Sequence, residues 1–529
     1  MRDYVFGANI IENLTSGVYK DSKVIYREYI QNACDQIDKA VAEGLLKSGI
    51  GSKKQGFGEI EIWLDIDNRT ITIEDNATGI KADDFEKTLG NIADSDKKIG
   101  EDKGFRGIGR LCGLAYCSKL IFTSKAKGEN VISRMICDAD KMRELINENV
   151  NGKKHTAVEV LNMINRFETS ITTDTEIDDH YFKVELININ AENTDLLDFR
   201  RVSDYLSFVA PVPYINSFHF RNKIYQYAKE KNYRIDEYNI CLYEKSYDSV
   251  QPIFKKYSLN FKTGNGDDSI YDIEFKDFFD DDGNLLAWLW FGFSQFKARI
   301  DKNCLMRGLR LRKENIQFGD ENVFQAFFSE KRGPLYFVGE VFAVSKDLIP
   351  NSQRDYFNEN ETRVIFEKLL RQYFYDELSK LYRNGSNINS IFRKIDKPLQ
   401  TELVITDEAH KDEEIEKFEK METEAQKAQL ELYKKLKKAE EQPDSLLSKL
   451  WKRAYNERIK TNVSPIESNI KNETAKKPEY RTKNLSEYSK KERKLISKIE
   501  GIIKYDCVES KIINAKTAEE IIKKIEDGL

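Results

Sequence analysis

The 529-residue sequence has no run of about 18 apolar residues, so it predicts no membrane-spanning helix. Its first residues, MRDYVFGANIIENL, lack a basic stretch followed by an apolar run, and we expect no secretory signal. The seven cysteines are scattered, without the paired spacing of a zinc site. These absences favour a cytoplasmic protein with reduced thiols.

The sequence also lacks an excess of either charge. It has 85 Lys and Arg against 90 Asp and Glu, for a net charge of -5. This balance argues against electrostatic binding of nucleic acid by the whole chain, although a local basic face stays open. At 33% charged and 11% aromatic residues, the composition is that of a globular protein.

Strand and helix patterns divide the chain into three parts. In residues 1–215, strands are expected at 59–67, 69–75, 119–126 and 181–190, with a hairpin turn at Asp67 and Asn68 and a helix at 195–209. This mixture predicts an α+β sandwich. Residues 216–400 form a second α/β domain, with strand-like segments LLAWLWFGF and LYFVGEVFAVS.

Residues 401–529 form a charged, mostly helical region. Phe418, Ala425 and Leu432 recur every seven residues, as do Met421 and Ala428. A coiled coil and a solvated amphipathic helix both fit this short heptad pattern. The segment 462–484 is predicted to be a linker.

The stretch EYIQNACDQID carries the first site motif. Glu28, Asn32 and Asp35 fall at i, i+4 and i+7 and therefore share one face of a helix. An amide oxygen such as that of Asn32 suits Mg²⁺, which prefers oxygen ligands. A carboxylate one turn away, Glu28, can orient and deprotonate a water.

Two further motifs complete a nucleotide-binding pattern. In EDNATGI, Asp75 ends a strand, where it can accept a hydrogen bond from an exocyclic amine such as that of adenine, and Gly79 lies in the following turn. In GFRGIGRLCGL, glycines precede a helical stretch, so backbone N–H groups and a helix dipole suit phosphate. These glycines are Gly104, Gly107 and Gly109, and residues 104–109 are called the phosphate loop below.

Each motif alone has an ordinary structural explanation. Asp75 is a common turn former, Glu28 a common surface acid, and glycine-rich turns occur in many loops. Neither the P-loop pattern nor the Rossmann spacing is present. The three motifs in this order and spacing nevertheless favour a nucleotide hydrolase site.

These motifs resemble those of the gyrase, heat-shock protein 90, histidine kinase and MutL (GHKL) superfamily, and most of all those of heat-shock protein 90. EYIQNACD is similar to that family's E-L-I-S-N-A-S-D, DNATGI to D-S-G-I-G-M, LGNIADSD to L-G-T-I-A-K-S-G, and GFRGIG to G-Q-F-G-V-G. The resemblance covers about 200 residues well. It implies a Bergerat-type ATP-binding α/β sandwich followed by a middle, transducer-like domain.

The resemblance also implies residue roles. Glu28 becomes the general base, Asn32 the Mg²⁺ ligand and Asp75 the adenine contact. Gly79 lets the base approach, the phosphate-loop glycines hold phosphate, and Asp35 supports the site. Residues 91–104 become a lid, from which Lys97 or Lys98 reaches phosphate.

The second domain carries one more motif. DLIPNSQRDYF resembles the family's L-P-L-N-x-S-R-E, whose arginine reaches the γ-phosphate, which makes Arg354 the candidate here. A surface ion pair with Asp355 or a nearby Glu is the alternative. Arg307, Arg310 and Arg312 lie close together in sequence and suggest either a partner or nucleic-acid groove or a solvated strand face.

One departure concerns the adenine pocket. Tyr181 and Phe182 occupy the places of the family's Gly-Thr pair, and Thr156 in HTAVEV has no preceding glycine. What replaces the family's threonine contact is therefore open.

The resemblance implies a Mg²⁺-dependent, heat-shock protein 90-like ATPase that works as an ATP-gated clamp in chaperone-like remodelling. The alternative is a DNA-associated clamp of the MutL or microrchidia type, in genome maintenance or defence against phage. A histidine kinase is disfavoured, because none of the four histidines lies in a phospho-acceptor motif. A protein client, nucleic acid and a homodimer are open as partners.

Overall fold

The computed structural model describes residues 6–15, 17, 21–92, 109–150, 154–173, 177–245, 249–400, 411–460, 495–496, 498–500, 502–503 and 514–528. The chain divides into two compact units, residues 1–454 and 455–529, and each is described by itself. Among the described helices, none is both long and apolar enough to cross a membrane.

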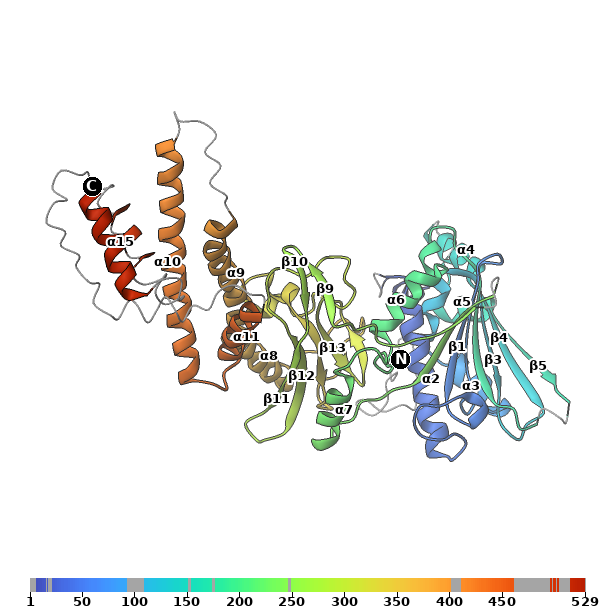
Figure 1. Cartoon of the computed structure of the whole chain (residues 1–529). Coiled ribbons are helices and arrows are strands. Elements are labelled where there is room, and N and C mark those ends of the chain that lie inside the picture. Colours follow the sequence, from blue (N-terminus) through green and yellow to red (C-terminus); the bar gives the residue numbers. More distant parts are fainter. Residues whose placement is uncertain are drawn as a thin grey trace. The chain divides into compact units, whose positions relative to one another are not determined.

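An eight-stranded sheet forms the first part of unit 1 (Figure 1). Its strand order is β5-β4-β3-β6-β2-β1-β7-β8. All neighbours are antiparallel except β1 and β7, which are parallel. The strands are β1 (Glu59–Asp65), β2 (Thr70–Asp75), β3 (Cys117–Lys125), β4 (Val131–Asp138), β5 (Asn165–Ile171), β6 (Tyr181–Ile189), β7 (Asn239–Glu244) and β8 (Ser249–Pro252).

The β1–β2 hairpin follows directly from its sequence. In EIEIWLD the apolar residues alternate, and Ile60, Ile62 and Leu64 are fully buried while their neighbours are half-exposed. Asp65 Oδ1 accepts a hydrogen bond from the Asn68 backbone N–H at 3.0 Å, which closes the turn. The hairpin places Asp75, the last residue of β2, opposite Ile60.

Helices α2, α3, α4 and α5 contact this sheet. Their buried side chains and those of the strands form one hydrophobic core. The helices of this part are α1 (Asn9–Thr15), α2 (Val24–Ala42), α3 (Ala82–Gly90), α4 (Ala139–Val150), α5 (Ala157–Ile164) and α6 (Phe199–Val209), with short turns η1 (Lys53–Gln55), η2 (Gly109–Ala115) and η4 (Thr194–Leu196). The α+β fold predicted for the first domain is confirmed.

A five-stranded sheet, in the order β11-β12-β15-β13-β14, forms the second part of unit 1 beside a small β9–β10 hairpin. The strands are β9 (Asn260–Thr263), β10 (Gly266–Ser269), β11 (Asp272–Phe279), β12 (Leu285–Phe293), β13 (Gly308–Lys313), β14 (Ile316–Phe318) and β15 (Val338–Ala343). The helices are α7 (Arg221–Glu230), η6 (Gln325–Phe327), η7 (Gly333–Tyr336), α8 (Glu361–Tyr373), η8 (Phe374–Leu378), α9 (Ser379–Gln400), α10 (Lys411–Glu441) and α11 (Leu446–Lys460). In the second unit, α15 spans Ala515–Gly528.

The arginines of β13 are largely buried, which contradicts the solvated strand face expected for them. Arg312 is fully buried, whereas Arg310 is 7% exposed and lines the cavity described below, and Arg307, just before β13, is half-buried. Arg312 Nε donates to Glu340 Oε1 at 2.7 Å, and Arg310 Nη1 donates to Gln317 Oε1 at 2.7 Å. These arginines belong to the interior of the second part.

The predicted domain limits at 215 and 400 stay predictions. Strands β7 and β8 lie beyond residue 215 yet complete the first sheet. Helix α10 packs against α9, and its heptad positions Ala425, Ala428 and Leu432 are buried. The predicted linker at 462–484 lies outside the described residues.

Candidate nucleotide site

Helix α2 carries the first motif. The Glu28 carboxylate is buried, at 2% exposure, although its backbone belongs to an ordinary amphipathic helix. Asp35 is also buried, and Asn32 is half-buried. Helix α2 contacts β2, so the helix carrying Glu28 and Asn32 packs directly on the strand that ends at Asp75.

Asp75 is a buried carboxylate with few polar neighbours. Its Oδ1 accepts a hydrogen bond from the Ala77 backbone N–H at 3.1 Å. Burial raises the pKa of Asp75 to about 7, in spite of this hydrogen bond, which lowers it. Gly79 has φ +65°, and a Cβ on it would collide with the Lys125 carbonyl oxygen, so glycine is required in this turn.

The register of the sheet shows which residues lie beside Phe182, which takes the place of the family's threonine. Asp75 on β2 pairs with Phe182 on β6, and Phe182 pairs with Ser124 on β3. Ser124 Oγ accepts a hydrogen bond from the Ile80 backbone N–H at 2.7 Å. The Ser124 hydroxyl therefore lies in the same row as Asp75, two strands away. Thr156, in contrast, is the N-cap of α5.

The phosphate loop is described only at its end. Gly104, Gly107, Lys97 and Lys98 lie outside the described residues, as does most of the expected lid. At Gly109, a Cβ would collide with the Glu28 carboxylate. The end of the glycine motif therefore touches the candidate general base.

Arg354 reaches this site from the second part of unit 1. It lies in the arginine loop, residues 349–357, which is closed by a bridge between Pro350 and Phe357. Its backbone has φ +53°, an uncommon conformation outside glycine. Arg354 is 5% exposed, and its Nη1 lies 3.5 Å from Glu28 Oε2. A surface pair with Asp355 therefore does not describe it.

Arg27 is a site residue that the sequence analysis missed. From α2, its Nη2 donates to the Gln353 carbonyl at 3.2 Å and its Nη1 to the Arg354 carbonyl at 3.4 Å. Its Nη2 also lies 3.6 Å from Glu28 Oε1. One side chain thus ties the arginine loop to the helix that carries Glu28.

Several buried polar atoms here make no hydrogen bond within the described part of the chain. They include Glu28 Oε1, Gln31 Oε1, Arg110 Nε and Arg354 Nη1. Buried groups of this kind usually have partners in folded proteins, and exceptions concentrate at functional sites. The arrangement leaves polar capacity for a ligand beside Glu28.

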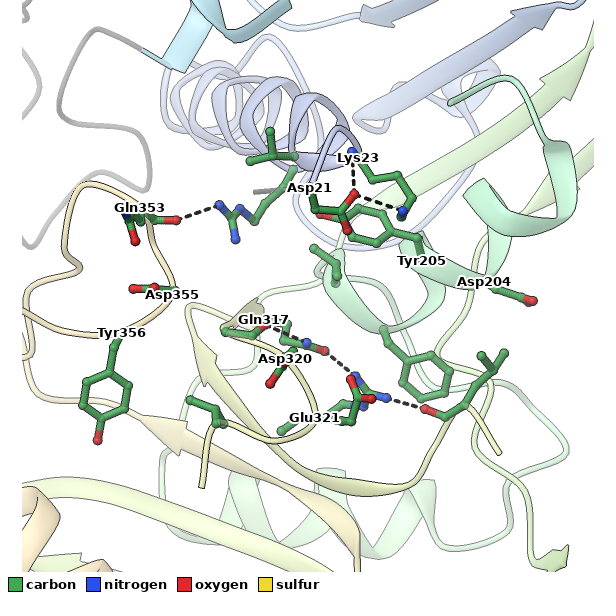
Figure 2. Close-up of a pocket in the computed structure, with 18 of the residues that line it drawn as sticks. Asp21, Lys23, Asp204, Tyr205, Gln317, Asp320, Glu321, Gln353, Asp355 and Tyr356 are labelled. Carbon is green, nitrogen blue, oxygen red and sulfur yellow. Dashed lines mark hydrogen bonds and ion pairs between the residues drawn. The ribbon is translucent and has the colours of Figure 1, made fainter. Parts of the chain in front are cut away.

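A cavity of about 890 Å³ adjoins the arginine loop (Figure 2). Gln353 and Asp355 line it from the loop, and Asp21, Lys23 and Tyr205 line it from the first part. The Arg27–Gln353 hydrogen bond runs along its wall. Among the described candidates, Glu28 and Asp75 do not line this cavity, so it is a neighbour of the site.

Comparison with known proteins agrees with this geometry. Residues 24–169 match the family described as histidine kinase-, DNA gyrase B- and HSP90-like ATPases. This segment is a GHKL-type ATPase domain. It contains α2, Asp75 and the end of the phosphate loop, and it confirms the resemblance that the motifs indicated.

Curated relatives of the ATPase domain include chaperones. The chaperone protein HtpG of Clostridium acetobutylicum is 32% identical over 148 residues, which are 27% of this chain and 23% of that protein. HtpG of Shouchella clausii is 25% identical over 260 residues, which are 48% of this chain and 38% of that protein. These matches therefore span less than half the length of either relative.

Proposed function

We propose that this chain binds ATP with Mg²⁺ and hydrolyses it, with Glu28 as general base and Arg354 as the group that meets the γ-phosphate. The observation that supports this proposal is the contact between these two buried side chains, which lie 3.5 Å apart. Glu28 comes from the first part of unit 1 and Arg354 from the second. Each also keeps one polar atom without a hydrogen bond within the described residues.

Asp75 is proposed to select the base. As a carboxylate it accepts a hydrogen bond from the exocyclic amine of adenine, and guanine offers a carbonyl oxygen at that place. Its burial strengthens this contact, because water competes poorly there. The glycine at 79 keeps the turn after Asp75 tight against Lys125.

Asn32 is the proposed Mg²⁺ ligand, and its half-buried amide fits that role. Within the described residues no group of three or more His, Cys, Asp and Glu side chains could hold a metal. Mg²⁺ is commonly held by one or two protein oxygens together with phosphate oxygens and water. A bound Mg²⁺ would neutralise charge on the phosphates.

The two arginines beside Glu28 suggest how the γ-phosphate of ATP makes this carboxylate available as a base. Arg27 and Arg354 both face the Glu28 carboxylate. A γ-phosphate offers Arg354 a second anion, and the guanidinium stabilises the charge that develops during transfer. Glu28 is then left to accept a proton from the attacking water.

We further propose that ATP drives a chaperone-like clamp cycle, as in the HtpG relatives. The arginine loop lies outside residues 24–169, so catalysis requires the second part to stay docked on the ATPase domain. Turnover is expected to be slow if closure limits it. The DNA-clamp alternative is kept beside this proposal, although Arg312 is fully buried and offers nucleic acid no contact.

The test compares Glu28→Ala with Asp75→Asn in the full chain. Glu28→Ala should bind ATP but lose about 10²- to 10⁴-fold in hydrolysis rate, because it lacks the general base. Asp75→Asn should lose binding, since an amide can present a donor to the adenine amine. Calorimetry and phosphate release measure the two effects.

Glu43→Ala is the matched control. Glu43 is an exposed acid at the C-terminal end of the same helix, where it pairs with Lys39. This variant should keep both binding and turnover. Wild-type turnover in Glu28→Ala would refute the general-base assignment, and wild-type ATP affinity in Asp75→Asn would remove Asp75 from the site.

A further inference from the structure

The side chain of Tyr29 joins α2 to the residues that follow the phosphate loop. Tyr29 is 3% exposed, and its hydroxyl donates to the Arg110 carbonyl at 2.9 Å. The same hydroxyl accepts a hydrogen bond from the Gly113 backbone N–H at 3.1 Å. Burial raises the pKa of Tyr29 well above its ordinary value, so the hydroxyl keeps its proton at neutral pH.

The backbone of η2 is shaped to receive this hydroxyl. A Cβ on Gly113 would collide with Tyr29 Oη, so only glycine leaves room for the contact. Four residues earlier, a Cβ on Gly109 would collide with the Glu28 carboxylate. Two successive residues of α2, Glu28 and Tyr29, therefore each lie against a glycine of the segment 109–113.

The residue type at position 29 sets this chain apart from the motif it resembles. In E-L-I-S-N-A-S-D a leucine stands where EYIQNACD has Tyr29. Leucine can fill the same apolar space, but it cannot bond to the Arg110 carbonyl or the Gly113 N–H. Packing alone therefore does not account for the hydroxyl, which saturates two backbone groups of one short segment.

We propose that Tyr29 is a positioning residue, which anchors the segment 109–113 to α2 beside Glu28 and so sets how tightly the site holds phosphate groups. The proposal rests on the proposed ATP-binding function. It predicts an effect that grows with the number of phosphates on the ligand. Adenosine, which would engage only the Asp75 end of the site, should be insensitive to the anchor.

The experiment removes the hydroxyl alone. Tyr29→Phe in the full chain should weaken binding of a non-hydrolysable ATP analogue by about three- to tenfold, because two backbone hydrogen bonds are lost. ADP should lose less, and adenosine affinity should stay within about twofold. Calorimetry with the three ligands gives the ratio of ATP-analogue to adenosine affinity, which a general loss of stability would not change.

Tyr26→Phe is the matched control. Tyr26 is fully buried on the same helix, and its hydroxyl donates to the Leu196 carbonyl at 2.5 Å, away from the phosphate loop. This variant should lower thermal stability comparably and leave the affinity ratio unchanged. An unchanged ratio in Tyr29→Phe, or an equal change in Tyr26→Phe, would overturn the proposal.

Hydrogen exchange provides a test that needs no variant and no nucleotide. In the wild-type chain, the Gly113 amide should exchange slowly, because Tyr29 holds it. Rapid exchange at Gly113 would also overturn the proposal. If wild-type protein binds no ATP, the proposed function fails and this inference fails with it, whereas wild-type binding with an unchanged ratio refutes the anchor alone.

Discussion

Two carboxylates buried in unit 1 each face two cations, and they differ in how fully they are bonded. In the second part, Glu340 Oε1 accepts from Arg312 Nε at 2.7 Å, and its Oε2 accepts from Lys255 Nζ at 3.0 Å. Tyr214 and Trp290 also donate to Oε2. In the ATPase domain, Glu28 lies 3.5 and 3.6 Å from its arginines, and its Oε1 has no hydrogen bond within the described residues.

The difference separates a structural charge from one available for chemistry. Glu340 has its lone pairs occupied by four donors from different segments, so it can bind nothing else without losing them. Burying three charged side chains is tolerated only because they satisfy one another. Glu28 has the same burial with looser contacts, so Arg354 can exchange this carboxylate for a phosphate at little cost.

Removing the core carboxylate should have the largest effect on the fold. Glu340→Ala leaves Arg312 and Lys255 buried without their counter-ion, which typically costs about 3–5 kcal/mol. Urea unfolding, followed by the fluorescence of the buried Trp288 and Trp290, measures the loss. Glu28→Ala should cost clearly less, because Arg27 keeps its bonds to the arginine loop. Equal losses of unfolding free energy in the two variants would contradict the difference drawn here between Glu340 and Glu28.

Arg354, which contacts Glu28, should matter for the hydrolysis rate. Arg354→Ala should lower the hydrolysis rate by about 10²- to 10³-fold, the usual cost of removing one group that stabilises transition-state charge. ATP affinity should change little, since the arginine acts mainly on the transition state. Single-turnover hydrolysis and calorimetry measure the two quantities.

Arg383→Ala is the control for that variant. Arg383 is a half-exposed arginine of α9, paired with Glu330. Its removal should leave turnover unchanged. A normal rate in Arg354→Ala would show that the contact with Glu28 is only structural.

Much of the fold and of the candidate site could be predicted from local sequence patterns. The helical spacing of Glu28 and Asn32 and the alternation of β1 and β2 are set by neighbouring residues, and the resemblance to known motifs then pointed to Arg354. The α+β fold and the superfamily followed from these short-range features. The same reasoning could not find partners far away along the chain.

Each gap in the sequence analysis involves such a distant partner. Arg27 carried no signal in the sequence, because its acceptors, the carbonyls of the arginine loop, lie more than 300 residues later. The β13 arginines suggested either a partner or nucleic-acid groove or a solvated strand face, and only Glu340 on a separate strand explains the burial of Arg312.

Asp75 extends the comparison to a third buried carboxylate, in this case one that forms no ion pair among the described residues. Burial raises the pKa of Asp75 to about 7. Burial alone would also raise the pKa of Glu340, but Arg312 and Lys255 outweigh it and lower that pKa to about 2. The stability from Glu340 is therefore present above its unfolded pKa and is lost as the pH falls towards 2, whereas that from Asp75 is lost as the pH rises through 7.

The raised pKa of Asp75 predicts a pH dependence of adenine binding at the site. The ionised carboxylate is the stronger acceptor for the adenine amine, so adenosine affinity should rise by up to about tenfold from pH 6 to pH 8, as the ionised fraction grows through a pKa near 7. Adenosine is the ligand of choice because it has no phosphate that titrates in this range. Calorimetry in two buffers of different ionisation enthalpy should also detect proton release on binding at pH 6. Glu340 stays ionised throughout, but burial lowers the pKa of its partner Lys255 to about 7, so the readout is adenosine affinity and not the stability of the core. A flat adenosine affinity between pH 6 and 8 would show that the ionisation of Asp75 is not coupled to adenine binding.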